Sequence, residues 1–220
     1  MPDPKNMGYF DRFSKPPYEG KTQLQKFWHF LWKEDSVESW ILNLLLAFVV
    51  IKYMLYPVLG LILGTSYPIV AVVSGSMHHP ASFDEYWQNT GTYYENIGIT
   101  KEEFREFPLH NGFNKGDLII LRGTDAAKLD VGDVLVYQAG RPDPIIHRVI
   151  EKKDGIFVTK GDNYLTNPHP IQDSTMDEYN IRPEQIRGKA FIRVPVLGYV
   201  KIIAVKAVCL FGEYRFCIVE

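Results

Sequence analysis

The sequence predicts a mainly β fold, in which an N-terminal transmembrane helix precedes a β domain that carries a partly helical insertion. Three features support this prediction. An apolar segment runs from Trp40 to Leu63, short β-branched runs separated by glycine turns follow it, and a polar, aromatic stretch interrupts those runs. The 220 residues leave room for one such anchor and one compact domain.

The apolar segment Trp40–Leu63 predicts a membrane anchor, because at about 1.5 Å per residue it forms about 36 Å of helix, enough to span a bilayer. A cleaved signal peptide has a shorter apolar core and begins near the N-terminus. Lys52 opposes insertion by about 2.5 to 3.5 kcal/mol, which the surrounding Leu, Ile, Val and Phe residues offset. Pro57 suggests a kink toward the second end.

The distribution of basic residues predicts the orientation of the anchor. Lys21, Lys26 and Lys33 precede it, whereas no Lys or Arg occurs between Gly64 and Thr100. Because basic residues are retained on the cytoplasmic side, we expect residues 1–39 in the cytoplasm and residues 64–220 outside it, in a single-pass protein of the plasma membrane. Aromatic and apolar residues ahead of the anchor predict a short helix in the inner interface; they are Phe27, Trp28, Phe30, Leu31 and Trp32.

The β domain is expected from short apolar runs bounded by glycine turns. A first strand, Tyr67 to Val73, leads into the turn at Ser74, and four more follow the insertion: Asp117–Leu121, Asp133–Tyr137, Ile145–Ile150 and Ile156–Lys160. The insertion, residues 79–113, contains a predicted helix at Thr100–Phe107 that starts with a capping-box pattern. It carries no motif that indicates chemistry.

The apolar tail, residues 194–220, is interrupted by Lys201 and Lys206. We expect it to pack on the domain at the membrane surface, and a second span is the alternative. Cys209 and Cys217 lack the spacing of a metal or redox site, so packing residues or a disulfide are the two interpretations. The near balance of 24 basic and 26 acidic residues argues against nucleic acid as a partner.

The turn Ser74-Gly75-Ser76-Met77 offers a candidate nucleophile. A glycine turn can expose Ser76 Oγ, while the Ser76 amide and the Ser74 hydroxyl can donate to one oxyanion. Such a turn is also common in ordinary loops. A serine nucleophile needs a base, and of the six histidines only His147 lies inside an apolar strand. His78 and His79 are alternatives to His147 as the base because they follow Ser76 closely. Because they lie on the same turn as Ser76, we expect them at the rim of the site instead.

Several motifs, in this order after the anchor, resemble those of type I signal peptidases: SGSM, NKGDLI, VGDVLVY, IIHRVI and TKGDN. The resemblance covers about Trp40 to Lys201, with the insertion outside it. Common bacterial members carry a lysine base in a segment resembling IKRV, and the matching segment here holds His147. The chain therefore looks like the Ser-His form of archaea and the endoplasmic reticulum, and the long insertion looks more like an archaeal member.

The resemblance implies a mechanism and its residues. Ser76 would form an acyl-enzyme, His147 would move the proton, and Ser74 and the Ser76 amide would bind the oxyanion. Asp162 matches the motif aspartate, although an aspartate there also suits a turn. Asp173 is the expected carboxylate that orients His147, with Asp177 as an alternative. No cofactor and no metal is implied.

The expected function is removal of signal peptides from exported preproteins by a membrane-bound serine endopeptidase. The partners are then signal peptides, membrane lipid and the protein translocation channel, and an extended substrate would add beside the strand near Ser76. Two alternatives are a non-catalytic scaffold subunit of a secretion complex and a membrane serine protease with other substrates.

Overall fold

The computed structural model describes residues 22–33 and 36–199. The chain divides into two compact units, Met1–Tyr56 and Pro57–Glu220, and each is described by itself. Most of the apolar tail lies outside the described residues, and so do the two cysteines, Cys209 and Cys217, and the first part of the N-terminal segment.

The first unit contains helices α1 (Gln23–Lys33) and α2 (Val37–Val50) and a π-helical turn at Ile51–Leu55. Two side chains of α2 satisfy carbonyls at the end of α1: Ser39 Oγ donates to Phe30 O and Asn43 Nδ2 donates to Leu31 O, each at 2.7 Å. Trp28 and Trp32 of α1 are exposed. The predicted position of this helix in a membrane interface stays a prediction.

A continuous helical stretch, Val37–Leu63, is long and apolar enough to cross a membrane, with a mean hydropathy of 2.1. It begins three residues before the predicted start because Ser36 caps it by accepting from the Ser39 amide. The Lys52 ammonium lies 5.6 Å and 5.3 Å from the ring centres of Phe48 and Tyr53, which gives this charge two local partners. The π-helical turn directly precedes α3 (Tyr56–Leu63) and its Pro57, where the regular hydrogen-bond ladder must change.

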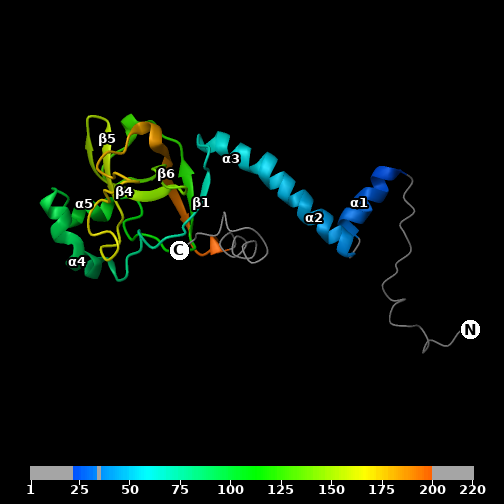
Figure 1. Cartoon of the computed structure of the whole chain (residues 1–220). Coiled ribbons are helices and arrows are strands. Elements are labelled where there is room, and N and C mark those ends of the chain that lie inside the picture. Colours follow the sequence, from blue (N-terminus) through cyan, green and yellow to red (C-terminus); the bar gives the residue numbers. More distant parts are fainter. Residues whose placement is uncertain (1–21, 34–35, 200–220) are drawn as a thin grey trace, which may run out of the picture. The chain divides into compact units, whose positions relative to one another are not determined.

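The second unit is built on a six-stranded antiparallel sheet with the order β1-β2-β6-β3-β4-β5 (Figure 1). The strands are β1 (Ile69–Ala71), β2 (Leu118–Arg122), β3 (Val134–Tyr137), β4 (Ile145–Lys153), β5 (Ile156–Lys160) and β6 (Ile186–Val194). The five predicted strands match β1 to β5 to within a few residues. The mainly β fold class is confirmed only in part, because helices hold more of the described residues than strands do.

Strand β6 was not predicted from the sequence; it carries three basic residues, Arg187, Lys189 and Arg193, among apolar and small ones. Two of its three cations pair with the acidic residues of two similar glycine turns. Lys189 Nζ lies 2.5 Å from Asp133 Oδ1, and Arg193 Nε lies 2.6 Å from Asp117 Oδ2. Each aspartate also accepts a backbone N–H from its own turn, so the two Gly-Asp segments have the same local role.

The insertion forms helices α4 (Phe83–Asn96) and α5 (Lys101–Glu106), which lie beside β4 and β5 (Figure 1). The capping box predicted for Thr100 and Glu103 is present, with both hydrogen bonds formed. Aromatic rings of the insertion pack on Ile150 of β4 and form one buried cluster. Its fully buried members include Tyr86, Tyr94 and Phe104. The insertion is therefore part of the hydrophobic core of the domain.

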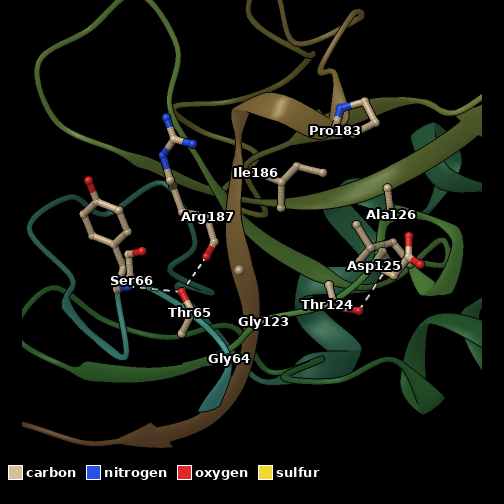
Figure 2. Close-up of a pocket in the computed structure, with 13 residues that line it drawn as sticks. Gly64, Thr65, Ser66, Gly123, Thr124, Asp125, Ala126, Pro183, Ile186 and Arg187 are labelled. Atoms are coloured by element: carbon tan, nitrogen blue, oxygen red, sulfur yellow. Dashed lines mark hydrogen bonds between the residues drawn. The ribbon is translucent and has the colours of Figure 1, made fainter. Parts of the chain in front are cut away.

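The last residue of helix α3, Leu63, contacts the sheet through close backbone contact. The Gly123 amide donates to Leu63 O at 2.7 Å, and a side chain on Gly123 would collide with the Gly64 carbonyl. Beside this contact lies a cavity of about 600 Å³, bordered by the ends of α3, β2 and the start of β6 (Figure 2). Thr65 Oγ1 donates to Arg187 O at 2.6 Å there.

We expect Gly132→Ala to destabilise the domain, because Gly132 has a φ of +94° and a Cβ there would collide with the Phe107 ring. Gly155→Ala is a matched control, since Gly155 has a φ of +78° with nothing within 4 Å of the added Cβ. Left-handed strain costs about 1–2 kcal/mol at both positions. Overpacking adds about 1–3 kcal/mol at Gly132 alone. Denaturant unfolding measures both changes, and equal losses of stability would contradict the predicted clash.

Candidate active site

Ser76 lies in a turn that follows β1. The Ser74 and Ser76 hydroxyls are 3.2 Å apart, and the His78 amide closes the turn by donating to Gly75 O at 3.0 Å. Ser74 is exposed and Ser76 is half-buried, whereas Met77 is buried in the core and anchors the turn. The Ser76 hydroxyl is thus held near the surface by a buried neighbour.

A second turn, residues 161–163, directly follows β5 and fixes the first. The Asn163 amide donates to Ser76 O at 2.8 Å, and Asn163 Nδ2 donates to Gly75 O at 2.9 Å. Gly161 must lack a side chain because a Cβ would lie 2.8 Å from Ser76 O. The GDN motif therefore forms the surface on which the serine turn rests.

His147 lies in β4 opposite Leu135 of β3, and only 3% of it is exposed. Its Nδ1 is 2.5 Å from Glu178 Oε1. In the β4–β5 register Arg148 pairs with Lys160. Extending that antiparallel register by one residue places Gly161 opposite His147. His147 and Ser76 therefore both lie next to Gly161.

Within the described residues, the hydrogen-bond partner of Ser76 Oγ is Ser74 Oγ, and no hydrogen bond joins Ser76 to His147. The structure brings the two residues to the same turn without a hydrogen bond between them. In enzymes without substrate, such bonds are often long and tighten when the substrate binds.

Glu178 is the carboxylate beside His147, and it is fully buried. Oε1 accepts from Tyr137 Oη at 2.6 Å and lies 3.0 Å from Thr159 Oγ1, while Oε2 accepts from the Ile171 amide at 2.7 Å. Burial raises the pKa of Glu178, but the hydrogen bonds from His147, Tyr137 and the Ile171 amide outweigh it and hold the pKa below its usual value. Glu178 is therefore ionised and fixed.

The predicted orienting carboxylates lie elsewhere. Asp173 is exposed, accepts from the Thr175 amide at 2.7 Å and pairs with Arg141 at 3.1 Å. Asp177 accepts from the Tyr179 amide at 3.1 Å. The structure thus places Glu178, and neither Asp173 nor Asp177, against His147. The sequence carried no clear signal for Glu178, because it lies in a connection without regular strand spacing.

Asp162 makes no hydrogen bond or ion pair with His147 among the described residues; it forms a buried ion pair with Arg148. Arg148 Nη2 lies 2.6 Å from Asp162 Oδ2, and Nε lies 3.0 Å from Oδ1. His79 Nε2 lies 3.2 Å from the same carboxylate. Burial raises the pKa of Asp162, but Arg148 and His79 together hold it well below the usual range. Its contacts are those of a structural residue joining three segments.

The rival histidines are occupied by other partners. His78 Nδ1 lies 2.5 Å from Asn114 Oδ1. His79, in addition to Asp162, stacks on Tyr86 with ring centres 3.7 Å apart. Among the residues that the structure describes, no group of His, Cys, Asp and Glu side chains could hold a metal ion. Neither Ser76 nor His147 lines the cavity of Figure 2.

The comparisons with known proteins point to one family, although no family model matches the chain. The signal peptidase complex catalytic subunit SEC11 of Komagataella phaffii is 30% identical over 161 residues, which cover 69% of this chain and 74% of the relative. The subunit of the same name from Penicillium rubens is 30% identical, over 68% of this chain and 69% of the relative. That from Neurospora crassa is 29% identical, over 69% and 72%. The chain therefore belongs to the family of signal peptidase complex catalytic subunits.

Proposed function

We propose that the chain removes signal peptides from exported preproteins by serine catalysis, with Ser76 as nucleophile and His147 as base. The observation that carries this proposal is the buried His147–Glu178 pair on the strand position opposite Gly161, the residue on which the Ser76 turn rests. Membership of the catalytic-subunit family supports the substrate class.

In this mechanism Ser76 Oγ attacks the scissile carbonyl as His147 Nε2 takes its proton. Nδ1–H of His147 donates to the Glu178 carboxylate, which fixes the tautomer and stabilises the imidazolium that forms. The Ser76 amide donates no hydrogen bond to the described residues, so it can bind the oxyanion together with Ser74 Oγ. The proton then passes to the leaving amine, and water hydrolyses the acyl-enzyme.

The free edge of β1 suits an extended substrate. The backbone of Val72 bonds to Gly116 and Asp117 on the β2 side. Because successive residues of a strand alternate, the backbone groups of Ala71 and Val73 point to the opposite side, where no described strand pairs. A peptide that adds as a strand there is led toward Ser76.

The proposed topology places residues 1–39 in the cytoplasm and the sheet domain outside it, in the plasma membrane. The helix Val37–Leu63 and the lysines ahead of it support this orientation. Anchoring confines the enzyme to the surface that holds its substrates and raises their effective concentration. The relatives are subunits of a complex, and we extend such partners, with the translocation channel, to this chain.

Ser76→Ala and His147→Ala should each lower processing of a preprotein in liposomes by about 10³-fold or more, because nucleophile and base act as a unit. Ser174→Ala, which changes an exposed serine in a loop, is the matched control and should process like the parent. Parent-like processing by either Ser76→Ala or His147→Ala would remove the assignment.

An acylating serine inhibitor should label Ser76 in the parent, and His147→Ala should slow the labelling. This result separates an enzyme from a non-catalytic scaffold, in which Ser76 should not react. Analysis of the N-termini of secreted proteins after depletion of the chain tests the substrate class. Unchanged N-termini, with Ser76 still labelled, would favour a protease with other substrates.

Glu178→Gln should lower kcat by about 10²–10⁴-fold, because a neutral amide no longer stabilises the imidazolium or fixes its tautomer. Asp173→Asn is the matched control, since it neutralises an exposed carboxylate that pairs with Arg141, and its kcat should stay close to that of the parent. Steady-state kinetics on one preprotein compares both variants. A larger loss for Asp173→Asn than for Glu178→Gln would return the orienting role to Asp173.

A further inference from the structure

A buried lysine lies beside the candidate site. Lys160 is the last residue of β5, and its side chain is fully buried. Nζ donates to Gly161 O at 2.9 Å, and the ring centres of Tyr93 and Tyr94 lie 5.2 Å and 5.3 Å from it. A buried ammonium is costly unless polar and aromatic partners compensate it. The mechanism above leaves this charge without a role.

The hydrogen bond of Lys160 orients a peptide unit that supports Ser76. In a trans peptide the carbonyl and the amide point in opposite directions. The Gly161 carbonyl faces Lys160, so the Asp162 amide faces the other way and contacts Met77 Sδ at 3.4 Å. The next amide, that of Asn163, donates to Ser76 O at 2.8 Å. The Gly161 carbonyl of this turn is therefore held by the Lys160 ammonium, and the Asn163 amide of the same turn holds the serine turn.

We propose that Lys160 is a positioning residue for the reaction: its ammonium fixes the Gly161–Asp162 peptide, and through this peptide it fixes the turn that places Ser76. The inference rests on the proposed function, because it takes Ser76 as the nucleophile. It also gives the insertion a role, since Tyr93 and Tyr94 of α4 form the walls that enclose the ammonium.

The charge of Lys160 depends on the groups that face it. Burial lowers the pKa of Lys160 to about 8; Asp162 and Glu178 oppose this shift, and Arg148 adds to it. Burial also raises the pKa of Tyr93 to about 12 and that of Tyr94 well above its usual value, so both phenols stay neutral. The ammonium is present below about pH 8 and is lost as the pH rises through that value. Its charge-assisted hydrogen bond weakens in the same range.

The test is the full-length enzyme in liposomes, with kcat and KM measured on a preprotein across the alkaline range. Lys160→Met should lower kcat by about 10-fold or more with little change in KM, and it should lack the alkaline loss of activity near pH 8. Lys160→Arg keeps its charge to higher pH, so it should recover part of kcat and shift the alkaline loss upward. Lys153→Met, at an exposed lysine of β4, is the matched control and should leave both the rate and the profile unchanged.

Ser76→Ala, measured alongside, separates the two proposals. If it processes like the parent, the proposed function fails whatever Lys160 does. If it is inactive while folded Lys160→Met keeps the kcat and pH profile of the parent, Lys160 only fills space. Should Lys160→Met not fold, the parent and Lys160→Arg decide. A parent without an alkaline loss of kcat up to about pH 10 overturns the inference, as does a Lys160→Arg profile that coincides with that of the parent.

Discussion

The buried ion pair between Arg148 and Asp162 organises the domain around the candidate site. Besides Asp162, the Arg148 guanidinium donates to the carbonyls of Pro108, Leu109 and Gly132 at 2.7–3.0 Å. It also lies 5.0 Å from the Phe104 ring centre. One side chain thus joins the insertion, the turn before β3 and the GDN turn. The two charges can be buried because all three nitrogens of the Arg148 guanidinium donate hydrogen bonds.

Two successive residues of strand β4, His147 and Arg148, bind different carboxylates on opposite faces of the sheet. Successive residues point to opposite faces, so Arg148 faces the insertion while His147 faces Glu178 and Tyr137. Asp162 therefore pairs with Arg148, and Glu178 is the carboxylate that hydrogen-bonds to His147. A shift of one residue in the register would exchange these roles. The precision of the candidate site depends on the register of β3, β4 and β5.

The insertion contributes to this register although it lies far from it in the sequence. Its aromatic cluster packs against Ile150, and its backbone carbonyls accept from Arg148. At its start, His79 Nε2 lies within hydrogen-bond distance of the Asp162 carboxylate. At its end, the Phe113 amide donates to Met77 O at 3.0 Å. Both ends of the insertion are therefore tied to the turns that border Ser76.

The sequence by itself determined the local elements and singled out two residues of the candidate site. The length of the apolar run indicated an anchor, the β-branched runs indicated β1 to β5, and the order of the motifs singled out Ser76 and His147. Each of these features is coded by neighbouring residues. The strand β6 was missed because its lysine and arginine residues obscure its pattern, and their partners, Asp133 and Asp117, are distant in the sequence.

Only the tertiary structure decided which carboxylate faces His147. Asp162, Asp173, Asp177 and Glu178 lie within one stretch of the chain, and residues 161–185 contain no regular strand whose spacing could assign them to a face. Glu178 reaches the histidine because the backbones of Thr159, Ile171 and Glu178 pair across that connection. Such pairing depends on how the chain folds back on β5. That path is set by long-range hydrogen bonds, which leave no periodic pattern in the sequence.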